Sequence, residues 1–302
     1  MQLATFDSGR LGVVVGDAIC DVTDVAHPAG AGAGLSAMRR VIADWAVFEP
    51  KIRAAADSGP RKPLSAVVLD PPVPDPSKVV AAPVNYVDHM QEMSEDFHIS
   101  SLGVFLKAPS SLIGSDARIS LPYTDRRFDQ EGELAVVIGR RSRNVSGDEA
   151  LANVFGYTGC LDITMRGGED RSTRKSFDTF TPLGPWIVTA DEFGSSDSVA
   201  LECAVNGVVR QRANTADLIW GVAALVAYAS SVMTLEPGDV ISTGTPAGVG
   251  QIFSGDEIEL QLSGLGPLRA AVTDEFATLC PTQGSGHGPV PPAAVTFPAP
   301  AT

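Results

Sequence analysis

Short runs of hydrophobic residues, separated by glycine, proline and aspartate, follow one another along most of the chain. Residues 3–6, 12–15 and 18–22 predict a hairpin followed by a third strand. The later runs are equally short and mostly β-branched, and lie at residues 79–80, 134–138, 155–161, 186–188, 200–205, 240–241 and 258–262. Asn206-Gly207, directly after one of them, is the strongest hairpin signal in the sequence. The pattern therefore predicts a chain dominated by short strands.

Helical periodicity is confined to a few segments. Residues 36–48 place Met38, Val41, Ile42 and Trp45 on one face and predict an amphipathic helix. Two more helices are expected at residues 148–154 and 216–232. Many strands with few helices favour an α+β, strand-rich fold with a β-roll or barrel-like sheet over a doubly wound parallel sheet.

Proline and glycine mark the expected domain limits. The proline-rich stretch at residues 60–76, which encloses a predicted strand at 64–69, separates a small N-terminal α+β domain (residues 1–72) from a strand-dominated domain (residues 73–279). Residues 280–302 carry almost no charge and are predicted to be a flexible tail. The alternating alanines and glycines at 29–34 do not match a dinucleotide-binding loop and predict a linker.

Charge and cysteine content exclude several classes of function. The chain has 22 Lys+Arg against 36 Asp+Glu, a net charge of −14, which disfavours nucleic acid and membrane surfaces as partners. Its four cysteines form no CxxC pair, which argues against structural zinc. No secretory signal opens the sequence and its longest apolar run is too short for a bilayer, so a cytoplasmic protein is expected.

Three acidic residues carry the most specific chemical signal. Glu131 and Glu133 are two apart at the start of an apolar run, and on a strand both carboxylates would point at one spot. Taken alone, the pair also fits an ordinary solvent-facing strand edge. Asp162, which follows the run at 155–161, favours a shared site, because a lone buried acid is costly. Three carboxylates without a histidine or cysteine cluster suit Mg²⁺, Mn²⁺ or Ca²⁺ better than zinc.

His89 and Glu92 form a second candidate pair. Three residues apart on a helical turn, they can hydrogen-bond, and a carboxylate beside an imidazole favours a general base. A surface helix that carries both residues is the alternative. A glycine-rich loop at residues 244–250 lacks the ending of a P-loop, and its backbone amides suit a carboxylate or an oxyanion.

Together these motifs resemble the fumarylacetoacetate hydrolase family over residues 78–276. The resemblance is carried, in order, by Asn85-Tyr86-x-x-His89, Phe105-Leu106-Lys107-x-Pro109-Ser110-Ser111, Glu131-Gly132-Glu133-Leu134, Lys175-Ser176-Phe177-Asp178, Pro182-Leu183-Gly184-Pro185 and Thr243-Gly244-Thr245-Pro246-x-Gly248-Val249-Gly250. Ala82-Pro83, where many relatives carry a glycine, and the short stretch between Asp162 and Lys175 depart from the family pattern. Both departures concern the approach to the site.

The resemblance implies a mixed β-roll catalytic domain that is usually a homodimer. It implies Mg²⁺ or Mn²⁺ held by Glu131, Glu133 and Asp162. It further implies catalytic roles for His89, Glu92 and Lys175 and substrate contacts from Tyr86, Arg166, Gly244 and Thr245.

The expected activity is metal-dependent hydrolysis of a C–C bond in a small 1,3-diketo acid, of acylpyruvate or fumarylpyruvate type, in the breakdown of aromatic compounds. The His89–Glu92 pair favours this reaction because hydrolysis needs an activated water. Isomerisation or decarboxylation of hydroxymuconate-type diacids or oxaloacetate is the nearest alternative. A catalytically silent protein that binds a keto acid is a further one.

Overall fold

The computed structural model describes residues 1–26, 34–292 and 297. Within them, an eleven-stranded sheet runs in the order β4-β3-β2-β1-β13-β11-β10-β16-β5-β6, with β7 beside β13. Its strands are β1 (Gln2–Phe6), β2 (Arg10–Val15), β3 (Ala18–Asp21), β4 (Arg61–Pro63), β5 (Val79–Ala81), β6 (Phe105–Lys107), β7 (Leu112–Ile113), β10 (Gly132–Ile138), β11 (Val154–Leu161), β13 (Thr181–Thr189) and β16 (Val240–Ser242).

Two smaller sheets complete the strand framework of the described residues. A five-stranded sheet has the order β15-β14-β18-β19-β8, and a three-stranded sheet has the order β12-β9-β17. Their strands are β8 (Ala117–Ser120), β9 (Phe128–Gln130), β12 (Thr164–Met165), β14 (Ala200–Val205), β15 (Val208–Asn214), β17 (Gly250–Gln251), β18 (Glu257–Leu262) and β19 (Leu268–Thr273). The strand-rich α+β fold predicted from the sequence is confirmed, and the sheets do not close into a barrel.

The core explains the hydrophobic patterns of the strands. Strand β14 alternates, with Leu201, Cys203 and Val205 buried between more exposed residues, because only one face meets the core. Strand β10 is buried at all seven positions. Its Leu134, Val136 and Ile138 join the main core, while Val137 packs into the core of the N-terminal helices. Coverage on both faces therefore produces the continuous apolar run in the sequence.

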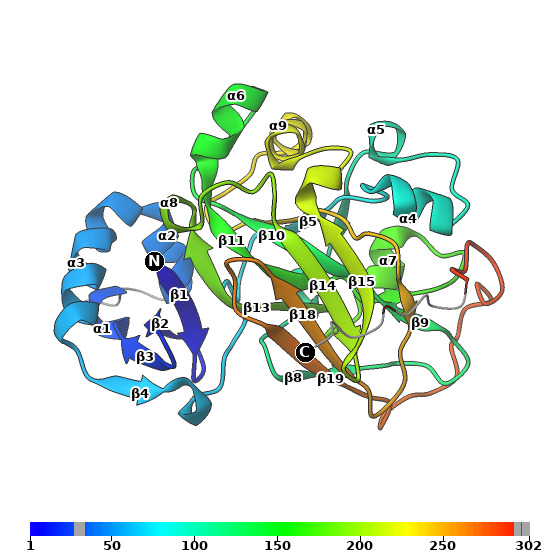
Figure 1. Ribbon diagram of the computed structural model, residues 1–302, viewed down its shortest axis with the longest axis horizontal. Helices are drawn as coiled ribbons and strands as arrows, with labels where there is room; N and C mark the ends of the chain where they lie inside the picture. The colour runs from blue at the N-terminus through cyan, green and yellow to red at the C-terminus, as the bar shows by residue number, and fades with distance from the viewer. Residues whose placement is uncertain (27–33, 293–296, 298–302) are drawn as a thin grey trace.

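The helices are short and lie around the sheets (Figure 1). They are α1 (Thr23–Ala26), α2 (Ala37–Ala43), α3 (Trp45–Ser58), α4 (Val87–Glu92), α5 (Ile99–Leu102), α6 (Gly147–Ala150), α7 (Arg171–Lys175), α8 (Ala190–Phe193) and α9 (Val222–Val232), with 3₁₀ turns at η1 (Leu64–Ala66), η2 (Pro109–Ser111), η3 (Leu151–Asn153) and η4 (Thr215–Asp217). In the described part of the chain, none of them combines the length and apolar character needed to cross a membrane.

Several predicted element limits are wrong. The helix expected at residues 36–48 is two helices, because Asp44 leaves helical geometry (φ −119°, ψ 38°) and the second helix continues to Ser58. The strand expected at 64–69 begins instead as the 3₁₀ turn η1. The last long helix starts only at Val222, since Asn214 caps a separate turn before it. In each case the local backbone conformation, with a side-chain cap at Asn214, overrides the hydrophobic pattern.

The N-terminal strands extend the sheet of the strand-dominated domain directly. Gln2 and Leu3 of β1 pair with Val188 and Ile187 of β13, so one sheet continues across the predicted domain boundary. The division at residue 72 remains a prediction. Most of the predicted 29–34 linker, and residues 293–296 and 298–302 of the predicted tail, lie outside the described residues. The described part of the tail hydrogen-bonds to the strand-dominated domain, for example through Cys280 N–H to Asp125.

Candidate active site

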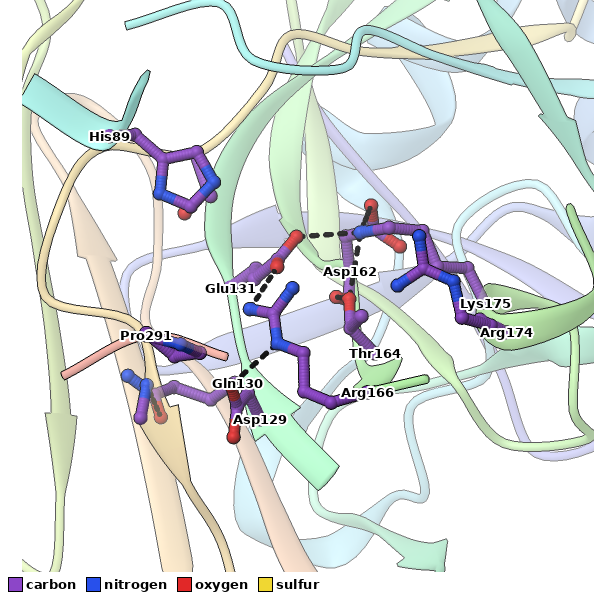
Figure 2. A network of polar contacts seen from close by, with 12 residues as sticks. His89, Asp129, Gln130, Glu131, Asp162, Thr164, Arg166, Arg174, Lys175 and Pro291 are labelled. Carbon is purple, nitrogen blue, oxygen red and sulfur yellow. Dashed lines mark hydrogen bonds and ion pairs between the residues drawn. The ribbon is translucent and has the colours of Figure 1, made fainter. Parts of the chain in front are cut away.

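Three buried carboxylates meet where two neighbouring strands reach their ends. Glu131 lies between β9 and β10, Glu133 lies in β10, and Asp162 follows β11, which pairs antiparallel with β10. One carboxylate oxygen from each residue lies within 4.8 Å of the others. Figure 2 shows Glu131 and Asp162 converging on one point. The i, i+2 spacing and the strand end therefore bring these carboxylates together, as the sequence predicted.

Two buried lysines neutralise part of this cluster. Lys175, at the end of α7, donates to Glu131 Oε2 and Asp162 Oδ2, both at 2.6 Å, and to Thr164 Oγ1 at 2.7 Å. The carboxylates raise the pKa of Lys175 although burial acts to lower it. Lys107 pairs with the other oxygen of Asp162 and donates to the Phe180 carbonyl at 2.9 Å.

Lys107 is a site residue to which sequence reasoning assigned no role. Its side chain is fully buried, and its partner Asp162 is 55 residues away in the sequence. A signal was present, since the chain has only five lysines and Lys107 follows the apolar pair Phe105-Leu106. A buried lysine needs a partner, so its position alone indicated a buried acid nearby.

The two glutamates of the cluster have opposite electrostatic environments. Burial acts to raise the pKa of Glu131, but the charges of Lys175 and Arg166 outweigh it and hold that pKa well below its usual range. Burial and the charge of Asp162 raise the pKa of Glu133 to about 8. The hydrogen-bond donors to Glu133 are neutral, namely the Ser242 hydroxyl and the Gly244 N–H at 2.8 Å. Among the described residues, Glu133 is therefore the carboxylate of the cluster to which no cationic side chain donates a hydrogen bond.

Arg166 links the cluster to a further buried acid. Its Nη2 donates to Glu131 Oε1 at 2.8 Å and its Nε to Asp129 Oδ2 at 2.7 Å (Figure 2). Asp129 is fully buried, and its second oxygen accepts from Arg127 Nε at 2.8 Å. Sequence reasoning missed the role of Asp129, although its spacing from Glu131 repeats the i, i+2 step that identified Glu133.

His89 lies across the pocket from the carboxylates, on the short helix α4 (Figure 2). The residue is buried, and its Nδ1 lies 3.1 Å from Glu92 Oε2. The other Glu92 oxygen accepts from the Gly248 N–H at 2.8 Å. The predicted pair therefore forms, and its His89 lines a pocket rather than an exposed helix surface. The glycine-rich loop uses amides of Gly244 and Gly248 to hold the protein's own carboxylates.

Asn85 fixes the start of this helix to the sheet. Its Nδ2 donates to the carbonyls of Thr243 (2.8 Å) and Trp220 (2.9 Å), and its Oδ1 accepts from the Trp220 N–H at 2.8 Å. Gly244 has φ +95°, and a Cβ there would lie 2.7 Å from Asn85 Cβ. The glycine is therefore required for the close approach of the loop to Asn85.

The four predicted substrate-contact residues separate into two groups. Arg166 and Thr245 line the pocket. Thr245 Oγ1 donates to the Gly132 carbonyl at 3.0 Å and accepts from Gln211 Nε2 at 2.7 Å. Tyr86 and Gly244 are not among the described residues that line the pocket; Tyr86 is fully buried, and burial raises its pKa. Their contact with substrate remains a prediction.

One pocket is lined by the three carboxylates, His89 and Thr245. Around the carboxylates its wall includes His89 from α4, the cationic side chains and a few apolar residues, namely Ala82, Pro83, Val84, Met93, Phe105, Arg166, Arg171, Arg174, Lys175 and Pro289. Ala82-Pro83, which departs from the family pattern, does line the approach. A lining in which acids and cations lie side by side suits a small anion that binds together with a metal ion.

The donor set fits a hard divalent cation. Its ligand atoms are carboxylate oxygens of Glu131, Glu133 and Asp162, and oxygen donors are those that Mg²⁺ and Mn²⁺ prefer. Lys175 and Lys107 occupy oxygens of Glu131 and Asp162, whereas Glu133 has neutral donors. The cluster thus retains negative charge that a metal ion would balance.

Comparison with known proteins identifies the family. Residues 78–273 match the family described as fumarylacetoacetate (FAA) hydrolase, C-terminal. The chain belongs to the fumarylacetoacetate hydrolase family. Within it, a maleylpyruvate hydrolase of Aquipseudomonas alcaligenes is 42% identical over 290 residues, which cover 90% of this chain and 99% of that protein.

Solved structures of family members agree with the fold. A maleylpyruvate hydrolase from Sphingobium sp. SYK-6, in complex with manganese(II) and pyruvate, is 40% identical with a TM-score of 0.82, covering 91% of this chain and 99% of that one. A 5-carboxymethyl-2-hydroxymuconate delta-isomerase from Mycobacterium smegmatis is 33% identical with a TM-score of 0.71, covering 91% and 100%. The relatives are thus enzymes of two reaction types.

Proposed function

We propose that this protein is a metal-dependent hydrolase that cleaves a C–C bond in an acylpyruvate. The observation that carries the proposal is that His89, which is paired with Glu92, lines the same pocket as Glu131, Glu133 and Asp162. A general base opposite a metal-binding cluster is what activation of water beside a bound keto acid requires. The similarity to two maleylpyruvate hydrolases along most of the chain supports the same reaction class.

The first role of the chain's residues is to activate water. Glu92 Oε2 accepts a hydrogen bond from the Nδ1–H of His89, which leaves Nε2 without a proton and able to take one from water. The Gly248 N–H holds the second Glu92 oxygen, so the carboxylate keeps the imidazole in one orientation. The buried position of His89 keeps bulk solvent from competing with the bound water.

The second role is to bind and stabilise the keto-acid end. Mg²⁺ or Mn²⁺ held by Glu131, Glu133 and Asp162 would supply Lewis-acid stabilisation of the charge that develops on the keto-acid oxygens. Arg166, Lys175 and Thr245 line the pocket and add fixed positive charge and a hydroxyl. Because these groups are held by buried partners before substrate arrives, little reorganisation accompanies the reaction.

The proposal is tested by the ultraviolet absorbance of acylpyruvates incubated with the protein and Mg²⁺ or Mn²⁺. Loss of the enol band with formation of two product acids supports hydrolysis. Glu131→Gln should abolish metal-dependent activity with the fold intact, whereas Glu257→Gln, which alters an exposed residue on β18, should behave as the wild type. Full activity of the Glu131→Gln protein would refute the metal assignment.

Isomerisation is the second candidate, because a hydroxymuconate isomerase is among the similar structures. A shifted absorbance band on a hydroxymuconate-type diacid, without two product acids, identifies an isomerase. His89→Ala should abolish hydrolysis yet spare decarboxylation of oxaloacetate, since loss of CO₂ needs no activated water. No change with any substrate would support a silent binder.

Three further expectations belong to this proposal. A role in the breakdown of aromatic compounds follows from the substrate class. A homodimer is expected from the family resemblance, and light scattering on the purified chain tests it. A cytoplasmic location is expected from the sequence, and fractionation of the producing cells tests it.

A further inference from the structure

A segment near the C-terminus forms part of the pocket wall. Residues 282–291, here called the C-terminal strap, lie beyond residue 273, where the family match ends. Pro289 of the strap lines the same pocket as Glu131, Arg166 and Lys175. We propose that the strap belongs to the active site: Pro289 contacts the acyl arm of the substrate, and the strap positions Arg166 and Arg174. The substrate part of this inference rests on the proposed function.

The first end of the strap is tied to the loop that holds Arg174. Thr282 Oγ1 donates to Glu169 Oε1, which also pairs with the buried Arg126. The Gly168 N–H donates to the Gly284 carbonyl at 3.1 Å. The Glu169 carbonyl in turn accepts from Arg174 Nε at 2.8 Å. The strap therefore secures the loop on which this pocket cation depends.

The second end of the strap is tied to Arg166. The Pro291 carbonyl accepts from Arg127 Nη1 at 3.4 Å, and Arg127 Nε donates to Asp129 Oδ1 at 2.8 Å. The other Asp129 oxygen holds Arg166 Nε at 2.7 Å. Figure 2 shows Pro291 and Arg166 on either side of Asp129. One chain of contacts thus runs from the strap to Glu131 of the metal-binding cluster.

The strap fits too closely to be an incidental contact. A Cβ at Gly284 would lie 2.2 to 2.4 Å from the Glu169 carboxylate, so no side chain can be accommodated there without displacing the strap or Glu169. A Cβ at Gly286 of the same segment would meet nothing within 4 Å. These two glycines provide a matched pair of variants in one segment.

Pro289 contributes a rigid apolar surface beside charged groups. The carboxylates, Arg166 and Lys175 provide the polar groups that a keto acid and its metal ion require. An apolar ring cannot bind those oxygens, so it suits the part of the substrate that carries no charge at that point. The strap would then restrict the size of the acyl arm, as a fixed wall does.

Truncation tests the substrate part of the inference. We expect a chain ending at Pro281 to show KM values for acylpyruvates raised about tenfold with kcat changed less than about threefold, because the strap binds and positions rather than reacts. A chain ending at Pro292 retains the strap and should match the full chain. Pro289→Ala should change KM most for the longest acyl arms. Equal KM values for the two truncated chains would overturn the substrate role.

A second measurement depends on neither substrate nor metal. Met93 is buried and lines the same pocket, so iodoacetamide should modify Met93→Cys slowly in the full chain. Ending the chain at Pro281 should raise that rate at least about tenfold, whereas ending it at Pro292 should not. Peptide mapping separates this thiol from Cys280. Equal rates would overturn the strap as a pocket wall, whether or not the protein hydrolyses acylpyruvates.

Point variants guard against a truncation that fails to fold. Gly284→Val should displace the strap and reproduce both the raised KM and the faster modification of Met93→Cys. Gly286→Asn, which keeps a residue tolerant of φ +78°, should leave both unchanged. The protein could fail to cleave any acylpyruvate while Gly284→Val still speeds the modification of Met93→Cys. In that case the proposed function is wrong, but the strap is still a wall of the pocket. If Gly284→Val and Gly286→Asn give the same modification rate and the same KM, the strap does not form a wall of the pocket.

Discussion

The floor and the roof of the pocket are built by different means. The floor, namely Glu131, Glu133, Asp162 and the two buried lysines, lies on or beside strands and is held by ion pairs. The roof is helix α4 with His89 and Glu92, held by neutral hydrogen bonds from Asn85 and Gly248. Val87 of that helix is half exposed. The comparison teaches that the floor should control stability and metal affinity, whereas the roof should control the chemical step.

The largest effect is expected from the floor. Lys107→Met leaves Asp162 with one fewer cation in a buried site, and breaking such a pair costs about 3 to 5 kcal/mol. Urea unfolding of the metal-free protein measures this loss. Lys62→Met, at an exposed position of β4, should change the free energy of unfolding by less than about 0.5 kcal/mol. If the two variants have equal free energies of unfolding, the ion pair of Lys107 with Asp162 does not stabilise the protein.

A change in the roof should affect rate more than stability. His89→Ala removes the proposed base and should lower kcat for hydrolysis about 10²- to 10⁴-fold. Its free energy of unfolding should fall by less than that of Lys107→Met, because no buried charge of the floor loses its partner. His98→Ala, on the neighbouring segment, should retain kcat within about threefold. If His89→Ala is as fast as the wild type, the roof has no role in the chemistry.

The floor should also make the stability of the metal-free protein depend on pH. The pKa of Glu133 is raised to about 8, so between pH 4.5 and 8 the folded state retains a proton that the unfolded chain releases, and stability falls as pH rises. Glu133→Gln should remove this fall and stabilise the metal-free protein at pH 8 by about 2 to 4 kcal/mol.

Glu131→Gln provides the opposite control for that measurement. Burial acts against ionisation of Glu131, but Lys175 and Arg166 hold its pKa low, so its ionised form stabilises the folded state. Its replacement should destabilise the metal-free protein at neutral pH. Urea unfolding between pH 5 and 8 compares the two variants. If both substitutions change the free energy of unfolding in the same direction, the two glutamates do not have opposite pKa shifts.

The smallest effect is expected where the roof only orients a residue. Glu92→Gln keeps the size of the side chain but loses its charge beside His89. A hydrogen bond to a charged group contributes about 1.5 to 3 kcal/mol, which corresponds to about a tenfold to hundredfold loss of kcat. Gln91→Ala, one residue before Glu92 and exposed, serves as the control.

Local sequence patterns predicted much of this molecule. Alternation in residues 200–205 and 258–262, and the turn at Asn206-Gly207, predicted strands that the structure contains. The steps between Glu131 and Glu133, and between His89 and Glu92, placed each pair together because strand and helix geometry depends on neighbours along the chain. Patterns of this kind failed at Asp44, where the backbone leaves helical geometry, and at residues 64–66, which form a 3₁₀ turn.

Contacts between residues that are far apart in the sequence could not be predicted from such patterns. Lys107 and Asp162 are 55 residues apart, and Gly248 and Glu92 are 156 apart. The contact of Pro289 with the pocket likewise depends on how the chain returns to it. No periodicity encodes these distances, because they follow from the register of the sheets and the packing of loops.

The sequence by itself determined which residues are able to bind a metal ion or move a proton, and which of them lie together on one strand or one helical turn. Only the tertiary structure decided that Glu131 faces Lys175 and Arg166 whereas Glu133 faces neutral donors. Two chemically identical side chains thereby acquire opposite pKa shifts. The physical reason is that burial and charge act through distance in space, which separation along the chain does not report.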